Sequence, residues 1–269
     1  MSIIKQNFEK MNITKIINAK NRFKLTVITA YDALFAKLFS QSADIILVGD
    51  SLNMSFAGKD DTLSATLDQM IYHTNAVCNG AKDSFVVMDM PFGTYINKDE
   101  ALKNCVKVYK KTAASAVKIE GGEDRADIVK HLTSNSIAVM GHIGLMPQYV
   151  RSVGGYKVRG KTKIDEEQLI RDAIAIEKAG AFCIVIEGVM SDVAQKITQA
   201  VSIPTIGIGA GKECDGQVLV WSDMLGFFED FKPKFVRHYL NGAKLVKDAV
   251  NSYRDDVQTQ NFPSKEEEY

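Results

Sequence analysis

Short apolar runs alternate with longer stretches of helical periodicity along most of the chain. Apolar runs bounded by turn residues are typical of buried strands, whereas apolar residues spaced three and four apart are typical of helices. Strands are predicted at 25–30, 45–49, 85–89, 116–119, 136–144, 182–186, 203–211 and 217–223. Helices are predicted at 30–43, 66–80, 98–114, 123–134, 191–201 and 235–250, and one more begins near Asp165 and ends at Gly180.

The order of these elements predicts an α/β fold, a (β/α)8 TIM barrel. Helices between most of the strand candidates favour a closed barrel over an open sheet. The short gap between the last two strands is the weakest part of this prediction. The chain has 269 residues, of which 46% are hydrophobic, and a barrel of this kind typically needs about 250. No linker composition is found, so we predict a single catalytic domain over 1–269 with a short polar tail from about 254.

Charge and cysteine usage exclude several classes of protein. Lysine plus arginine and aspartate plus glutamate are equal at 33 each, so no global field recruits nucleic acid or an anionic membrane. The sequence has no long apolar span and no signal-peptide core, which predicts no membrane segment. The cysteines lie far apart and form no CxxC pair. We therefore expect reduced, buried thiols in a cytoplasmic protein rather than a zinc site or a disulfide scaffold.

Four of the apolar runs end on an acidic residue. They are IILVGD ending at Asp50, FVVMD at Asp89, AVKIE at Glu120 and CIVIE at Glu187. In an α/β barrel, the carboxyl ends of the strands share the rim that carries the chemistry. Several acids at one rim repel each other unless a cation or a proton joins them. The pattern therefore predicts an enzyme, with Mg²⁺ as the expected metal.

Lys118 and Glu120 are two positions apart on one strand, so both point to the same face. A cation and an anion placed in this way suit a site that holds a metal and an anionic substrate. His142 ends the predicted fifth strand in MGHIG, which raises the odds of a functional role above those of an average lone histidine.

Each of these positions also has a structural interpretation. Lys118 and Glu120 can form a surface ion pair, and Asp50 with Ser51 can form a turn that bonds its own backbone. Asp89 can cap a turn before Pro91, and a strand-end Glu187 can face solvent. The agreement across four strands favours the functional interpretation, because unrelated causes would have to place acids at the same end each time.

Two glycine-containing segments leave alternatives open. GIGAG (207–211) resembles a phosphate-binding loop, although a tight turn near the substrate is the favoured interpretation. The segment 144–163 has no clear periodicity, contains several glycines and is the most basic stretch of the chain. Long loops at a barrel rim are usually functional, so we expect a lid; a solvated basic loop or a subunit contact is the alternative.

The motifs VGDSLNM, MDMPFGTY, VKIEGG, GHIGLMPQ, GGYKVRG, IEGV, IPTIGIGAG and DGQVLVWSDMLG occur in this order along the chain. In order and approximate spacing, this set resembles the ketopantoate hydroxymethyltransferase family, also called 3-methyl-2-oxobutanoate hydroxymethyltransferase. The resemblance runs from about Thr26 to Tyr239. Two departures are visible: Asn53 stands where a glycine is expected, and the tail FPSKEEEY lacks an expected histidine.

The resemblance implies a Mg²⁺-dependent hydroxymethyltransferase acting on two small molecules. The family transfers a one-carbon unit from 5,10-methylenetetrahydrofolate to 3-methyl-2-oxobutanoate, forming 2-dehydropantoate on the route to pantothenate and coenzyme A. By similarity, Asp50, Asp89 and Glu120 hold Mg²⁺ directly or through water, and Glu187 is the proton acceptor. Asp50, Ser51, Asp89 and Lys118 are then expected around the oxo acid. The resemblance further implies a homodecamer.

Three other functions remain open from the residues alone. A Mg²⁺-dependent carbon–carbon or carbon–phosphorus lyase acting on a small 2-oxo acid would share the acidic rim, but would be expected to carry a catalytic cysteine loop or a phosphonate site. Cys214 is a poor candidate for that role. A barrel that binds a phosphorylated sugar through GIGAG would work without metal. A non-catalytic binding or assembly protein would not need Glu187.

Overall fold

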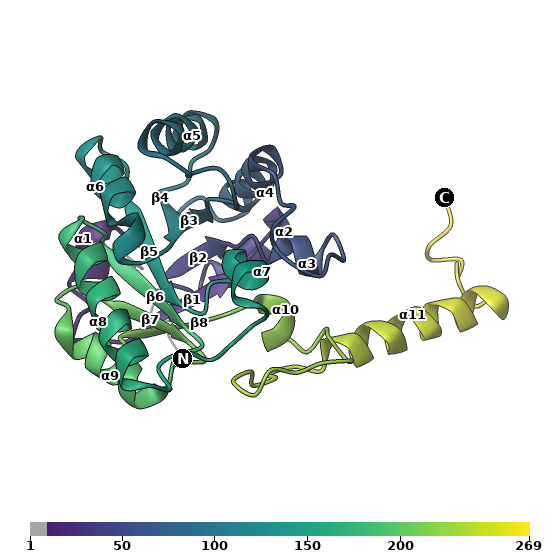
Figure 1. Ribbon diagram of the computed structural model, residues 1–269. Coiled ribbons are helices and arrows are strands. Elements are labelled where there is room, and N and C mark those ends of the chain that lie inside the picture. Colours follow the sequence, from purple (N-terminus) through teal and green to yellow (C-terminus); the bar gives the residue numbers. More distant parts are fainter. Residues whose placement is uncertain (1–9) are drawn as a thin grey trace, which may run out of the picture. The chain divides into compact units, whose positions relative to one another are not determined.

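The eight strands close into one parallel barrel, with each strand bonded to its neighbours in sequence order and β8 returning to β1. The computed structural model describes residues 10–269. Figure 1 shows the strands as a ring with helices around it, and the predicted (β/α)8 barrel is confirmed. The strands are β1 (Leu25–Thr29), β2 (Ile45–Val48), β3 (Phe85–Asp89), β4 (Ala116–Glu120), β5 (Val139–Gly144), β6 (Cys183–Glu187), β7 (Thr205–Ile208) and β8 (Gly216–Leu219).

Helices follow most of the strands, as the sequence pattern predicts. They are α1 (Ile13–Ile17), α2 (Ala33–Phe39), α3 (Leu52–Ser55), α4 (Leu67–Gly80), α5 (Lys98–Lys111), α6 (Ala126–Ser134), α7 (Val150–Val153), α8 (Lys163–Lys178), α9 (Ser191–Ala200), α10 (Trp221–Met224) and α11 (Gly242–Gln258), with the 3₁₀ turns η1 (Glu123–Arg125) and η2 (Pro147–Tyr149). The chain passes from β7 to β8 through residues 209–215 without a helix. Both of the last two predicted strands are therefore present, although the connection between them is short.

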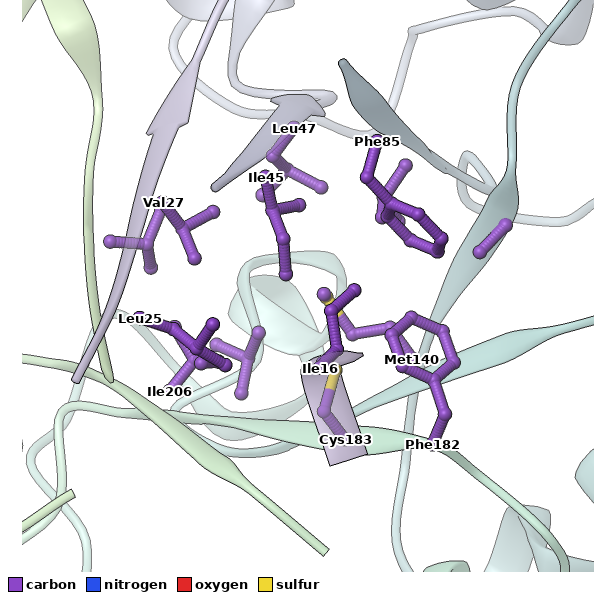
Figure 2. Packing of buried hydrophobic residues seen from close by; sticks show 14 of the residues in the cluster. Ile16, Leu25, Val27, Ile45, Leu47, Phe85, Met140, Phe182, Cys183 and Ile206 are labelled. Atoms are coloured by element: carbon purple, nitrogen blue, oxygen red, sulfur yellow. The ribbon is translucent and has the colours of Figure 1, made fainter. Parts of the chain in front are cut away.

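Alternating residues of the strands build the barrel core. Ile45, Phe85 and Ala116 are the first residues of three strands, and they belong to one cluster of buried apolar side chains. Figure 2 shows Ile16 among these side chains, so α1 supplies part of the core at the N-terminal ends of the strands. Leu25 is in the same cluster. Burying a side chain of this size contributes about 1.5–3 kcal/mol, so this end of the barrel is a packed floor.

Three predicted boundaries are corrected. The helix expected from Asp165 begins at Lys163, because the Thr162 hydroxyl accepts a hydrogen bond from the Asp165 backbone at 3.2 Å and caps the helix. The eighth strand ends at Leu219 and not at 223. The helix expected over 235–250 begins only at Gly242, capped by Asn241. It continues to Gln258, through the start of the predicted tail.

The structure divides into two compact units, one ending at Leu219 and the other spanning Val220–Tyr269. The barrel and the candidate site lie in the first unit. The organisation as a single catalytic domain stays a prediction. Among residues 10–269, no helix combines the length and the apolar character needed to cross a membrane.

Candidate active site

Polar side chains replace apolar ones on the inward faces at the C-terminal ends of four adjacent strands. On β3, Phe85 and Val87 belong to the apolar core cluster, and the next residue on that face is Asp89. The strand registers place Asp89 beside Lys118 and Glu120 beside His142. The inward columns, followed from floor to rim, are Phe85, Val87 and Asp89; Ala116, Lys118 and Glu120; Met140 and His142; Cys183, Val185 and Glu187.

Lys118 is a buried ammonium group surrounded by acids. Its Nζ lies 3.2 Å from Oδ1 of Asp89 and 3.9 Å from Oε1 of Glu120, and its side chain is only 4% exposed. Burial opposes the charge, but the carboxylates of Asp89, Glu120 and Asp50 outweigh it and raise the pKa of Lys118 above its ordinary value. Lys118 is therefore a fixed cation, and it is not the surface ion-pair partner of the alternative interpretation.

Asp50 and Ser51 follow β2 and enter the same site. The Asp50 backbone N–H donates to Oδ2 of Asp89 at 3.1 Å. Ser51 makes no side-chain cap bond to α3, and its hydroxyl lies 2.8 Å from the hydroxyl of Tyr31. Burial, together with the charges of Asp89 and Glu120, raises the pKa of the Asp50 carboxyl well above its ordinary value. The self-bonded turn is not what the structure shows.

Glu187 is the most accessible of the four acids. Its side chain is 20% exposed, compared with 5% for Asp89 and 1% for Glu120. Gly144, its partner in β5, has a φ of 98°, and a Cβ there would lie 2.3 Å from the Glu187 carbonyl oxygen. Only glycine lets β5 pass this close to β6, so this backbone approach helps to place Glu187 at the rim.

His142 bridges the acids of two strands. Its Nδ1 lies 3.4 Å from Oε1 of Glu120, and its Nε2 lies 3.3 Å from Oε2 of Glu187. Burial and the nearby Lys118 lower the pKa of His142, but the carboxylates of Glu120 and Glu187 outweigh both and raise it to about 9. The Nζ of Lys118 is 3.0 Å from Nδ1, a contact that suits a neutral ring. The carboxylates determine the direction of the His142 pKa shift, because negative groups outnumber positive ones around the ring. Glu187 is therefore not isolated at the rim, because His142 lies beside its carboxylate.

Gln148 is a buried site residue that the sequence analysis did not identify. Its side-chain amide donates to Oδ2 of Asp50 at 2.8 Å, and its backbone N–H donates to Oε2 of Glu120 at 3.0 Å. It lies on η2 in the aperiodic segment after β5. Its only signal in the sequence is its place in the quoted motif GHIGLMPQ.

The donor set fits a hard divalent cation. Asp89 Oδ1 and Glu120 Oε1 are buried and have no hydrogen-bond partner. Burial raises the pKa of the Asp89 carboxyl, although Lys118 opposes the shift. Within residues 10–269, no group of three or more His, Cys, Asp or Glu is arranged to hold one ion. Mg²⁺ usually keeps several waters and is held by only one or two carboxylates, so the orphaned oxygens suit it.

The basic segment 144–163 is more ordered and more neutralised than the sequence indicates. It contains η2 and α7, which corrects the expectation of an aperiodic loop. Arg151 bonds Oδ2 of Asp61 at 2.8 Å, and Nε of Arg159 donates to Oδ1 of Asp165 at 3.0 Å. Lys157 donates to the Val153 carbonyl. Arg159 therefore has a structural partner and is not a free cation.

The two remaining sequence features have local structural roles. Asn53 is buried in α3, and its amide donates to the Asp61 carbonyl at 2.7 Å and to Ser64 Oγ at 3.0 Å. It thus ties down the turn that follows. In GIGAG, Gly209 and Gly211 have φ of 61° and 84°, which is the tight-turn geometry. Cys214 is buried, like the other cysteines.

The chain is similar to proteins of one family over nearly its whole length. A family model described as ketopantoate hydroxymethyltransferase matches residues 10–265. The 3-methyl-2-oxobutanoate hydroxymethyltransferase of Aliarcobacter butzleri is 83% identical over 269 residues, which are 100% of both chains. The protein of the same name from Sulfurimonas denitrificans is 67% identical over 255 residues, covering 95% of this chain and 97% of the relative.

A solved structure with a different activity shares the fold. Phosphonopyruvate hydrolase in complex with oxalate and Mg++ is similar with a TM-score of 0.61 and 14% identity, covering 96% of this chain and 93% of that chain. At this identity the likeness shows the barrel fold alone. The family model and the full-length relatives carry the assignment: this chain belongs to the ketopantoate hydroxymethyltransferase family and is a hydroxymethyltransferase enzyme.

Proposed function

We propose that the enzyme transfers a hydroxymethyl group from 5,10-methylenetetrahydrofolate to 3-methyl-2-oxobutanoate, forming 2-dehydropantoate. The family assignment supports this activity. The observation that carries its chemistry is the rim of the barrel, where buried acids and one buried lysine lie near the more exposed Glu187. The reaction would be the first step of the pantothenate branch toward coenzyme A.

Asp50, Asp89 and Glu120 would hold Mg²⁺, directly or through water. Asp89 Oδ1 and Glu120 Oε1 support this assignment because a buried polar atom without a partner costs free energy that a bound cation would recover. When bound, the metal would supply positive charge to the keto oxygen, where negative charge develops as the C3 proton is lost.

Lys118 and Ser51 would bind the carboxylate end of the oxo acid, beside Asp50 and Asp89. The charge count supports this arrangement. Three acids and one substrate carboxylate against Mg²⁺ and Lys118 leave about −1. A protonated His142, whose pKa is raised to about 9, would offset Glu187. The loaded site would then be close to neutral, so that an anionic substrate is not repelled.

Glu187 would accept the C3 proton. Its partial exposure leaves room for a substrate carbon to approach, while the buried acids are already enclosed. The contact between His142 Nε2 and one carboxylate oxygen limits rotation of the Glu187 side chain. A base must lie within about 2.6–3.2 Å of the proton-bearing atom, so a restricted carboxylate is an advantage. The resulting C3 carbanion would attack the one-carbon unit of the folate.

Location and assembly are proposed from the family resemblance. We expect a cytoplasmic enzyme that works as a homodecamer, with two small-molecule substrates and no nucleic-acid or membrane partner. The electrically balanced composition supports the exclusion of polyanionic partners.

Phosphonopyruvate hydrolase has the same barrel fold, but at 14% identity this likeness does not assign an activity. The alternative function is a Mg²⁺-dependent carbon–carbon or carbon–phosphorus lyase, which would share the acidic rim. The cysteines argue against it. All four are buried, and burial raises the pKa of the Cys214 thiol, which disfavours the reactive thiolate.

Metal-dependent proton exchange at C3 tests the proposed function. The enzyme is incubated with 3-methyl-2-oxobutanoate in deuterium oxide without folate, and the C3 proton is followed by NMR. Exchange should require Mg²⁺ and stop on chelation; adding 5,10-methylenetetrahydrofolate should then produce 2-dehydropantoate. Absence of exchange with metal, or cleavage of a phosphonate or a carbon–carbon bond instead, would contradict the proposal.

A further inference from the structure

Gln148 connects segment 144–163 to the acids of the rim through hydrogen bonds. Its side-chain amide nitrogen donates to Oδ2 of Asp50 at 2.8 Å and to the Met90 carbonyl at 3.0 Å. Its side-chain oxygen accepts from the Tyr95 hydroxyl, and its backbone N–H donates to Oε2 of Glu120. The residue is only 4% exposed.

The orientation of this amide is fixed by its partners. A carboxylate and a backbone carbonyl can only accept hydrogen bonds, so the nitrogen of the amide must face Asp50 and Met90. The Tyr95 hydroxyl then donates to the opposite end. Pro147, which begins η2, has no N–H. The Gln148 backbone N–H is therefore the first available donor of that turn, and it points at Glu120.

The bonds divide the oxygens of the carboxylates into two sets. Oδ2 of Asp50 and Oε2 of Glu120 are held by Gln148, and Oδ2 of Asp89 is held by the Asp50 backbone. The second set includes Asp89 Oδ1 and Glu120 Oε1, which have no hydrogen-bond partner. One oxygen is thus fixed by a hydrogen bond on each acid. The other oxygen of Asp89 lies 3.2 Å from Lys118 Nζ, and that of Glu120 lies 3.4 Å from His142 Nδ1, so both face cationic groups without a hydrogen bond.

An amide donor is suited to this task because it orients a carboxylate without cancelling its charge. A lysine or arginine in the same place would orient the acids but would also neutralise them and compete with a bound cation. Hydrogen bonds from outside the ligand set commonly fix the geometry of metal-binding carboxylates, and their loss typically costs about 10–100-fold in metal affinity.

We propose that Gln148 is a positioning residue for the divalent cation. Its two hydrogen bonds would fix the orientation of the Asp50 and Glu120 carboxylates, and they would link the position of segment 144–163 to metal binding. This inference rests on the proposed function, since it concerns the metal assigned there.

The test compares Gln148→Met with Gln168→Met. Both replace an amide by an apolar side chain of similar length. Gln168 provides a matched control, because its Nε2 also donates to a carboxylate at 2.8 Å, that of Asp172, on α8. Binding of Mg²⁺ and of Mn²⁺ is measured by calorimetry without substrate. Gln148→Met should raise the dissociation constant about 10–100-fold, and Gln168→Met should leave it within twofold.

A second variant separates positioning from simple packing. Tyr95→Phe keeps the ring and leaves Gln148 intact but removes the hydroxyl that orients its amide. We expect a smaller loss of metal affinity than for Gln148→Met. Adding metal should also slow hydrogen exchange of the backbone amides of residues 148–158 in the wild type, and less so in Gln148→Met.

The outcomes distinguish this inference from the proposed function. A folded Gln148→Met variant that binds metal as tightly as the wild type, with the same protection of 148–158, overturns the role of Gln148 alone. A wild-type protein that binds neither Mg²⁺ nor Mn²⁺, even with 3-methyl-2-oxobutanoate present, overturns the proposed metal site itself.

Discussion

A largely buried lysine and a fully buried one lie at opposite ends of the same barrel and have very different surroundings. Lys20 precedes β1, and its Nζ lies 2.8 Å from Oδ2 of Asp215, which precedes β8. The side chains are 11% and 5% exposed. Oδ2 of Asp215 also accepts the Thr205 backbone N–H at 2.9 Å, and Lys20 donates to the Thr198 carbonyl. This cluster has one cation, one anion and bonded polar atoms.

Lys118 at the other end faces three acids, and two of their oxygens have no hydrogen-bond partner. A buried pair offsets its desolvation cost only when the geometry is good and the remaining polar groups are bonded. The Lys20 cluster meets that condition and the Lys118 cluster does not. A buried charge alone therefore does not identify a binding site. An excess of negative charge, with oxygens that lack a hydrogen bond, does identify one, because a bound cation can offset that charge.

The largest effect is expected for Glu187→Gln. The amide is nearly isosteric but cannot accept a proton as a base, so C3 exchange should fall by about 10²–10⁴-fold, whereas oxo-acid binding and folding should persist. Deuterium exchange without folate measures the C3 exchange rate, calorimetry measures oxo-acid binding, and circular dichroism measures folding. Exchange at the wild-type rate would show that another residue is the base, and His142 would be the next candidate.

Asp215→Asn should remove the anion that pairs with Lys20, and it should lower the free energy of unfolding without affecting the reaction. Removing the partner of a buried lysine typically costs about 3–5 kcal/mol, which chemical denaturation would detect. Asp89→Asn provides the opposite case: it removes one of several crowded acids, so we expect no loss of metal-free stability and a loss of metal affinity. The comparison fails if Asp215→Asn weakens Mg²⁺ binding, or if Asp89→Asn destabilises the metal-free protein as much as Asp215→Asn does.

Asp89→Ala and Glu120→Ala should both weaken Mg²⁺ activation. Loss of a ligand leaves the developing oxyanion less stabilised, and we expect an effect of about 3 kcal/mol on the scale of such charge stabilisation. Asp89 should be the more severe, because it also accepts the Asp50 backbone N–H and lies 3.2 Å from Lys118. Exchange rates against Mg²⁺ concentration measure this. Variants with wild-type Mg²⁺ dependence would remove these residues from the site.

The sequence was sufficient to predict the part of the site that strands build. Strand periodicity fixes which residues share a face, so the meeting of Lys118 and Glu120 followed from their spacing alone. His142 was identified because it lies at the end of the predicted fifth strand. Gln148 could not be found in this way, because it lies in a segment whose path depends on tertiary bonds to Asp50 and Glu120.

The start of α8 differs from the prediction because distant partners occupy the side chain that was expected to cap the helix. Asp165 resembles an N-cap, but its carboxylate is engaged by Arg159 and by the Gly160 backbone N–H. Thr162 caps the helix instead. In contrast, Asn97 has the cap position that its sequence context indicates, because its side chain accepts a hydrogen bond from the Glu100 backbone N–H at 2.9 Å. Local motifs predict such caps only where no distant partner intervenes.

The smallest effect concerns segment 144–163, whose basic residues we expect to contact the carboxylates of the folate glutamate tail. Arg151 and Arg159 are already paired with Asp61 and Asp165. The Lys157 ammonium donates to the backbone carbonyl of Val153, which is a neutral group, so Lys157 becomes the better candidate.

Lys157→Glu should raise the folate KM about two- to fivefold, as expected for an exposed charge, more for longer polyglutamates and less at high salt, where screening is strong. Arg159→Gln is the matched control: it breaks the bond to Asp165 and should disturb monoglutamate and polyglutamate folates equally. Folate-independent C3 exchange should stay nearly unchanged for Lys157→Glu. A KM increase that ignores both tail length and salt would eliminate the tail contact, because a screened attraction between Lys157 and a chain of carboxylates must depend on both.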